Sequence, residues 1–333
     1  YHMKKYQIYG IGAALVDTEA VVTDNFLSTH KIDKGLMTLV DEERQFELLS
    51  ALSSHAFHIK RSCGGSVCNT VVAASCFGSK TFYSGKVADD EDGRFFVEDL
   101  QATGVDFHKA GAGSGTTGKC LVMVTDDAER TMNTFLGANL DLTSNEVDEP
   151  TLINSDWLYL EGYLVTDDTR TDVAVRAIEC AKANRVKTSL SLSDPFVVQV
   201  FKDNLLKVIG NGVDLLFCNS DEAKSFTKTH NTEAAAEQLK KFAKTFVITL
   251  GAGGSLSYDG VDLLQTPGVT ANAVDTNGAG DMYAGAFLYA INAGHSYALG
   301  AKFANEAAAR VVSQFGPRID SLEYVQIKHL FNI

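Results

Sequence analysis

One short stretch, Val274 to Asp281, carries residue types that suit phosphoryl-transfer chemistry. Gly278, Ala279 and Gly280 are small enough for backbone N–H groups to approach a ligand, and the helical run that follows would direct its positive dipole end there. Asp281 would then sit beside an anion site, where a carboxylate makes sense as a base next to a transferring phosphoryl group. The alternative is a capped helix whose glycines serve close packing.

A second glycine-rich loop also opens a helix. Gly64 and Gly65 precede an Ala-rich run, and Asn69 can both donate and accept hydrogen bonds to a ligand. A tight turn that packs a helix on a sheet is the alternative. Asp17 follows the end of the first predicted strand, Lys4 to Gly12. The two glycines of this strand do not make a dinucleotide fingerprint, because the third glycine and the following helix of that motif are missing.

From position 156 onward, short apolar strands alternate with helices, which indicates a parallel sheet with right-handed crossovers. Ligands of such sheets bind beyond the carboxyl ends of the strands. Several polar groups fall at those ends, namely Glu161, Asp194, Asn219 with Glu222, and the loop Thr249 to Gly254. Any one of them could be a helix cap, but together they predict a site at this edge.

Two other segments, about 14–40 and 113–138, are β-prone and lack that alternation. The second contains a GxxxxGK pattern ending at Lys119, but Cys120 replaces the Ser or Thr of a P-loop and a hairpin follows instead of a helix. We expect both segments to form a small sheet inserted in one α/β domain spanning 3–333. A lid that excludes water is its natural role.

Composition bounds the function further. The chain has 333 residues, 45% of them hydrophobic, with a formal net charge of −13, which is ordinary for a globular protein and argues against nucleic acid or an anionic membrane as partner. No apolar run approaches the roughly 20 residues of a membrane span, so we expect a cytoplasmic protein. Tyr1 and His2 precede Met3 and look like expression remnants, and the six cysteines look like reduced core thiols.

With these motifs, the sequence resembles the PfkB/ribokinase family of sugar and nucleoside kinases. Asp275 to Asp281 resembles the DTxGAGD signature of the family, the diglycine loop with Asn69 resembles its N-terminal signature, and Asn219 to Glu222 is similar to its NxxE motif. Asn277 stands where many members have Gly or Thr. The resemblance implies a doubly wound, mainly parallel sheet flanked by helices (ribokinase-like) with a small β-sheet lid, and ATP-dependent transfer to a hydroxyl.

The resemblance also implies roles for individual residues. Asp281 would be the catalytic base, and the backbone of Asn277, Gly278, Ala279 and Gly280 would form the anion hole. The acceptor would contact Asp17, Gly64, Gly65, Asn69, Arg130 and Glu161. ATP would contact Asn219, Thr249, Gly251, Gly254 and Asn305, while Asn219 and Glu222 would hold Mg²⁺ through water. The family often uses a monovalent cation such as K⁺, which the sequence leaves open.

The stretch Glu129 to Asn139 is more similar to the adenosine-kinase-like branch than to ribokinase proper, and Phe135 could stack on a nucleobase. We therefore expect a nucleoside acceptor, with a free sugar such as ribose or fructose as the alternative. A non-catalytic sugar-binding protein on the same fold is a further alternative, against which Asp281 speaks. The free edges of the lid sheet leave monomer and homodimer both open.

Overall fold

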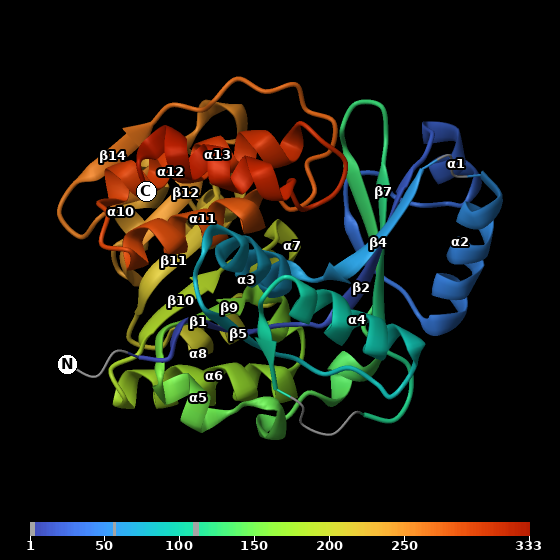
Figure 1. The fold of residues 1–333 in the computed structure, drawn as a ribbon, viewed down its shortest axis with the longest axis horizontal. Coiled ribbons are helices and arrows are strands. Elements are labelled where there is room, and N and C mark those ends of the chain that lie inside the picture. Colours follow the sequence, from blue (N-terminus) through green and yellow to red (C-terminus); the bar gives the residue numbers. More distant parts are fainter. Residues whose placement is uncertain (1–3, 56–57, 109–112) are drawn as a thin grey trace.

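A computed structural model describes residues 4–55, 58–108 and 113–333; the expected remnants Tyr1 and His2 lie outside these ranges. Within them, nine strands form one large sheet in the order β14-β13-β12-β11-β10-β9-β1-β5-β6, and all neighbours from β12 to β6 pair in parallel (Figure 1). The hairpin pairings of β12 with β13 and of β13 with β14 are antiparallel. The strands are β1 (Tyr6–Ile11), β5 (Thr81–Ser84), β6 (Asp106–Phe107), β9 (Ser155–Glu161), β10 (Lys187–Ser191), β11 (Val213–Asn219), β12 (Ala243–Thr249), β13 (Ser255–Tyr258) and β14 (Leu263–Thr266).

Helices cover both faces of this sheet, and each face has its own apolar core. One layer contains α3 (Ser66–Phe77), α4 (Glu91–Ala102), α11 (Ala279–Asn292), α12 (Tyr297–Val312) and α13 (Ser321–Phe331). The other contains α5 (Glu149–Ile153), α6 (Asp168–Ala183), α7 (Pro195–Val200), α8 (Lys202–Ile209), α9 (Ser220–Thr227) and α10 (Thr232–Leu239). Short 3₁₀ turns lie at η1 (Gly137–Asp141), η2 (Ser144–Glu146), η3 (Gly162–Thr166) and η4 (Gly251–Gly253).

The large sheet is buried on both sides, which explains why its strands read as continuous apolar runs. In β9, Trp157 and Tyr159 belong to the core under α3 and α11, whereas Leu158 and Leu160 belong to the core under α6. The same alternation runs along β11. The doubly wound, mainly parallel sheet predicted from the sequence is confirmed.

A second sheet has five strands in the described residues, in the order β3-β8-β7-β2-β4, and stands at the right of Figure 1. Its strands are β2 (Leu15–Val21), β3 (Met37–Leu39), β4 (Ile59–Gly64), β7 (Gly118–Val124) and β8 (Arg130–Phe135). It draws on both expected segments, but β4 was not predicted, and the first segment also contains a helix, α1 (Asp24–Thr29). β4 is an edge strand with three exposed residues at its start, so it shows no alternating apolar pattern.

One face of the second sheet is covered by helices of the same chain. α1 and α2 (Glu42–His55) pack Phe26, Leu48 and Leu52 against Ala20 and Leu121 of the sheet. In the described residues the edge strands of this sheet are β3 and β4. The opposite face looks toward the carboxyl edge of the large sheet.

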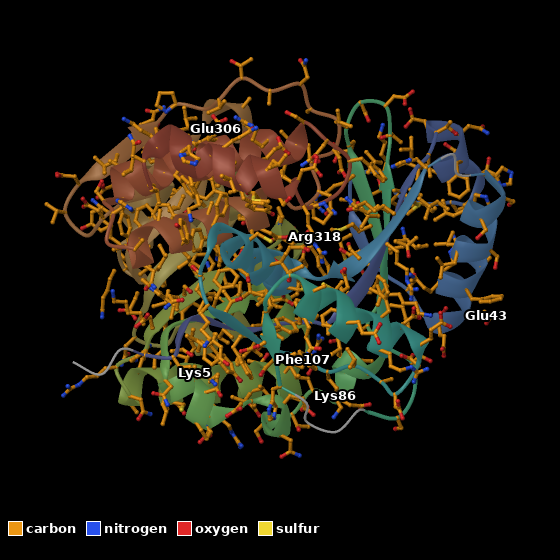
Figure 2. The ribbon with its side chains drawn as sticks, in the orientation of Figure 1. Lys5, Glu43, Lys86, Phe107, Glu306 and Arg318 are labelled. Atoms are coloured by element: carbon orange, nitrogen blue, oxygen red, sulfur yellow. The ribbon has the colours of Figure 1, made fainter. Side chains whose placement is uncertain are left out.

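The two sheets are tied together by the segment before α13. Arg318, labelled near the centre of Figure 2, donates from Nη2 to the backbone oxygen of Cys63 and to Asp99, both at 3.0 Å. Cys63 belongs to β4 of the second sheet, and Asp99 belongs to α4, which packs on the large sheet. One guanidinium therefore joins the C-terminal segment to both parts of the molecule.

The hairpin interpretation of the GxxxxGK segment is confirmed. Lys119 lies on β7, which pairs with β8 in antiparallel fashion, and its Nζ lies 2.8 Å from Asp92. A P-loop is thereby excluded, since a strand rather than a helix contains and follows the lysine.

All six cysteines are unpaired thiols. Among the helices that the structure describes, none is both long and apolar enough to cross a membrane.

Candidate active site

A cavity of about 250 Å³ lies where the inner face of the second sheet meets the carboxyl edge of the large sheet. The ends of β9, β11 and β12 reach it from the large sheet, and β2, β3 and β8 reach it from the second sheet. The predicted site residues that line it are Asp17, Gly65, Asn69, Arg130, Glu161, Asn219, Glu222, Thr249, Asn277, Gly278, Ala279, Gly280 and Asp281. Four predicted residues do not line it: Gly64, Gly251, Gly254 and Asn305.

The loop before α11 has the geometry of an anion site. The carboxylate of Asp275 holds it, accepting from the backbone N–H of Asn277 at 2.8 Å and of Gly316 at 2.9 Å. Gly278 has φ of +74°, and a Cβ there would lie 2.7 Å from Cβ of Pro317, so glycine is required. A Cβ on Gly280 would meet nothing within 4 Å, which leaves its backbone open to the cavity.

Asp281 lies on the first turn of α11 and is held by two side chains of α3. Its Oδ1 accepts from Oγ of Ser66 at 2.7 Å, and its Oδ2 accepts from Nδ2 of Asn69 at 3.1 Å. Burial raises the pKa of Asp281, while these two bonds and the charge of Arg130 act to lower it. The result is a fixed carboxylate with a raised proton affinity, as a general base requires.

The diglycine loop makes room for Asp17. A Cβ on Gly64 would lie 2.1 Å from the Asp17 carboxylate, and Gly65, at φ of +96°, would bring a Cβ within 2.2 Å of the carbonyl oxygen of Ala13. Asp17 is buried, and burial together with nearby Glu19 and Asp281 raises its pKa well above the usual range. Gly64 thus shapes the site from behind Asp17 without lining the cavity.

Glu161 joins the cavity from the end of β9, with both carboxylate oxygens used by backbone. Oε1 accepts from the N–H of Ala13 at 2.7 Å, and Oε2 accepts from the N–H of Val67 at 2.9 Å. Burial raises its pKa to about 7. The residue therefore fixes the β1–β2 connection and the start of α3, which carry the groups around Asp17 and Asp281.

Arg130 is the one basic side chain on the cavity wall in the described part of the chain. It enters from β8 and pairs with no carboxylate among the described residues; its Nη1 donates to the sulfur of Met132, at 3.3 Å. Its charge acts to lower the pKa of Asp275, Asp281 and Glu222. An unpaired guanidinium among carboxylates is well suited to an anionic ligand.

On the far side of the cavity, Asn219 and Glu222 form a reciprocal cap on α9. Oδ1 of Asn219 accepts from the N–H of Glu222 at 2.8 Å, and the Glu222 carboxylate accepts from the N–H and Nδ2 of Asn219 at 2.9 and 3.0 Å. Burial raises the pKa of Glu222 to about 7. The described residues contain no group of three His, Cys, Asp or Glu that could hold a metal ion. The carboxylate and amide oxygens of this pair are of the kind that hold Mg²⁺ through its waters.

The other residues predicted for the nucleotide shape the loop beyond β12. Gly254 has φ of +94°, and a Cβ there would lie 2.0 Å from the carbonyl oxygen of Thr266. Asn305 is buried and donates to the carbonyl oxygens of Thr266 and Pro267 at 3.3 and 3.1 Å. Asn305 thus anchors the segment that Gly254 packs against, whereas Thr249 lines the cavity itself.

Most of the site lies in a region that matches a known protein family. The pfkB family carbohydrate kinase profile matches residues 30–323, which include both glycine-rich loops and the Asn219–Glu222 pair. The chain belongs to the PfkB family of carbohydrate kinases. It is therefore a phosphotransferase of sugars or nucleosides.

Proteins similar to this PfkB kinase include both nucleoside kinases and sugar kinases. Adenosine kinase 2 of Arabidopsis thaliana is 28% identical over 84% of this chain and 86% of its own, and 5-dehydro-2-deoxygluconokinase of Bacillus licheniformis is 25% identical over 93% and 91%. Among solved structures, adenosine kinase from Sinorhizobium meliloti superposes with a TM-score of 0.91 at 35% identity over 98% and 99% of the two chains. A probable sugar kinase from Rhizobium etli superposes at 0.92 with 30% identity over 99% and 100%.

Some cavity residues of this kinase escaped sequence reasoning. The inner face of the second sheet contributes a largely apolar wall of Leu15, Met37, Leu39, Cys120, Met132, Thr134 and Leu136, which we call the lid wall. Alternation along β8 could have found part of it, because every second residue from Arg130 lines the cavity. Phe135, considered for base stacking, does not line the cavity, because strand alternation turns it to the other face. Asp194, which was also predicted at this edge, does not line the cavity; it caps α7 by accepting from the N–H of Phe196 at 2.7 Å.

Ser66 was also missed, although it lies between the predicted Gly65 and Asn69. Its small polar side chain gave no signal beyond that of an ordinary N-terminal helix residue. Its role follows only from the packing of α3 against α11, which brings residues 66 and 281 within hydrogen-bond distance.

Proposed function

We propose that this PfkB kinase transfers a phosphoryl group from ATP to a hydroxyl of a nucleoside, with Asp281 as the base. The observation that carries the nucleoside assignment is the lid wall, which faces the same cavity as Asp17 and Asp281. Leu15, Met37, Leu39, Met132 and Leu136 offer apolar contact area that a free sugar, with hydroxyls around its ring, could not use. A nucleobase would cover that area while its sugar reaches the carboxylates.

The polar half of the cavity suits the chemistry of transfer. Asp281 would take the proton of the attacking hydroxyl, with its carboxylate oriented by Ser66 and Asn69. The transition state of phosphoryl transfer is loose, so positioning and charge stabilisation matter most. The backbone N–H groups of Asn277 to Gly280 and the guanidinium of Arg130 are the donors available for the migrating charge.

ATP would lie along the carboxyl ends of β11 and β12. Asn219 and Glu222 would orient the waters of Mg²⁺, which supplies charge neutralisation between the phosphates when bound. Thr249 lines that part of the cavity, and Gly251, Gly254 and Asn305 set the shape of the adjoining loop. A monovalent cation near the anion hole stays a prediction, to be tested by comparing turnover in potassium and tetramethylammonium salts.

A coupled ADP-release assay tests the acceptor class directly. We expect turnover with adenosine, inosine or guanosine to exceed that with ribose or fructose. The reverse order would favour the free-sugar kinase. Binding of ATP without release on any acceptor would favour the non-catalytic sugar-binding alternative.

The mechanism is tested by Asp281→Asn. This change keeps the shape of the side chain and one acceptor oxygen for the neighbouring donors Ser66 and Asn69, so we expect ATP binding to persist while turnover falls by roughly 100-fold or more. Asp141→Asn, on an exposed aspartate outside the cavity, is the matched control and should behave as wild type. Near-normal turnover in Asp281→Asn would rule out the assigned base.

A further inference from the structure

Glu19 is a buried carboxylate that the proposed reaction does not use. It lies on β2, two residues beyond Asp17 and on the same face, and it is 1% exposed. Its Oε1 accepts a hydrogen bond from Nδ2 of Asn277. Its Oε2 is buried and has no hydrogen-bond partner among the described residues.

The bond to Asn277 reaches the start of the anion loop. Asn277 precedes Gly278 directly, and its own backbone N–H donates to Asp275 at 2.8 Å. With the backbone held by Asp275 and the side chain held by Glu19, the peptide that leads into Gly278 is fixed at two points. Its orientation decides where the first N–H groups of α11 are directed.

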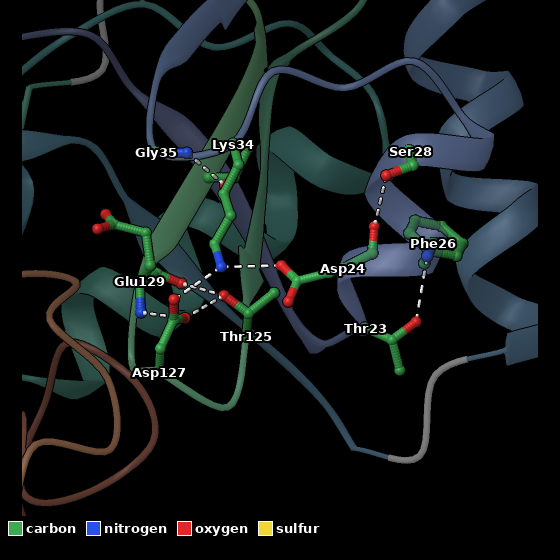
Figure 3. Close-up of polar contacts among 10 residues, drawn as sticks. Thr23, Asp24, Phe26, Ser28, Lys34, Gly35, Thr125, Asp127 and Glu129 are labelled. Atoms are coloured by element: carbon green, nitrogen blue, oxygen red, sulfur yellow. Dashed lines mark hydrogen bonds and ion pairs between the residues drawn. The ribbon is translucent and has the colours of Figure 1, made fainter.

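A neighbouring contact joins the same two parts of the molecule. Oγ1 of Thr276 donates to the carbonyl oxygen of Ala128, in the turn between β7 and β8, at 3.2 Å. That turn is itself braced, because Nζ of Lys34 bridges Asp24 and Asp127 at 2.8 and 2.7 Å (Figure 3). The second sheet thus contacts two consecutive residues of the anion loop, and the side chain of Glu19 supplies the buried one.

A role in packing alone does not explain this glutamate. Burial and the negative charge of Asp275 raise its pKa to about 7, against the Asn277 bond and the charges of Lys60 and Arg318, which act to lower it. A buried carboxylate with one oxygen unsatisfied destabilises a fold relative to an apolar side chain of similar size. The next residues of β2, Ala20 and Val21, are apolar.

We propose that Glu19 is a positioning residue for phosphoryl transfer, which holds the anion loop in its active shape through Asn277. The loop is then aligned only while β2 of the second sheet is seated against it, so the donors for the migrating charge and the covering sheet are assembled together. This inference rests on the anion-hole role proposed above for Asn277 to Gly280.

Steady-state kinetics of three variants test it. In Glu19→Ala, kcat should fall by about tenfold or more, the size of one lost hydrogen bond at the transition state, while KM for the acceptor changes little. Glu19→Gln retains an oxygen that can accept from Asn277 and should recover most of kcat. Thr18→Ala, on the neighbouring residue that faces the other side of β2, should equal wild type.

A double-mutant cycle separates positioning from general stability. Asn277→Ala should lower kcat as much as Glu19→Ala, and the double variant should lose little more, because both single changes break one contact. Equal kcat in wild type and Glu19→Ala, after correction for the folded fraction by thermal melting, would overturn the proposal, as would additive losses in the cycle. Loss of turnover in Asp281→Asn with no effect of Glu19→Ala would leave the proposed function intact and remove only this inference.

Discussion

Replacing Gly64 with alanine should disturb the proposed acceptor site through Asp17. The new Cβ would lie 2.1 Å from the Asp17 carboxylate, whereas ordinary contacts between carbon atoms are about 3.5 Å or longer. The carboxylate must therefore retreat by more than about 1 Å, out of its buried position (Asp17 is only 4% exposed) and toward the cavity that it lines. Overpacking of this kind lowers the free energy of unfolding by about 1–3 kcal/mol.

Kinetics should show a larger effect than stability. A displacement of about 1 Å in a positioning group can lower rates about 100-fold, so we expect kcat/KM for the acceptor to fall by that order while ATP binding persists. Urea denaturation and the ADP-release assay measure the two effects. Gly253→Ala is the stability control, since its Cβ would meet only Cβ of Leu250 at an ordinary 3.4 Å.

The clash itself can be isolated by adding Asp17→Ala to Gly64→Ala. Removing the carboxylate relieves the contact, so the double variant should regain the stability lost in Gly64→Ala, with a coupling energy of about 1–3 kcal/mol. Its acceptor kinetics should stay impaired, because Asp17 is then absent. Wild-type stability and acceptor kinetics in Gly64→Ala would refute this reasoning.

Three further predictions concern proton affinity and the nucleotide side. Ser66→Ala removes a bond that lowers the pKa of Asp281, so the acid limb of the pH profile of kcat/KM should move to higher pH. Asn219→Ala removes the α9 cap and should lower the free energy of unfolding by about 1 kcal/mol in urea denaturation, and raise the Mg²⁺ concentration needed for half-maximal rate. Burial raises the pKa of three glutamates from 4.5 to about 7, so the folded state holds their protons more tightly, and the free energy of unfolding should fall as pH rises through that window. Denaturation midpoints at several pH values check this, and the groups concerned are Glu19, Glu161 and Glu222.

The sequence could predict the carboxyl edge of the large sheet because the relevant rules are local. Parallel strands end on one edge, so polar residues directly after apolar runs, such as Asn219 and Thr249, can be placed together from the order of residues alone. Glycine pairs are equally informative, since Gly65 and Gly278 do have positive φ in the structure. The hairpin after Lys119 followed from its charged turn and alternating strands.

Contacts across long sequence separations could not be predicted in this way. Glu19 stands in a polar-interleaved strand that reads as exposed, but it is buried, and its side chain accepts a hydrogen bond from a loop 258 positions later. The helix α1 is six residues long, too short for a periodic signal, and only its Thr23 cap marks it. Glu161 was placed correctly at a strand end, but its use of both oxygens for backbone N–H groups depends on two other segments meeting there.

Three residues on one face of β2 make contacts that the proposed reaction would need. Leu15 belongs to the lid wall, Asp17 lies at the diglycine loop, and Glu19 reaches Asn277. These are every second residue of one strand, so base, sugar and migrating phosphoryl group would be aligned along a single straight element. A shift of β2 by one residue against β7 would turn all three away together. Acceptor binding and anion-hole geometry should for this reason respond jointly to changes in that pairing, even though the proposed general base, Asp281, lies on α11.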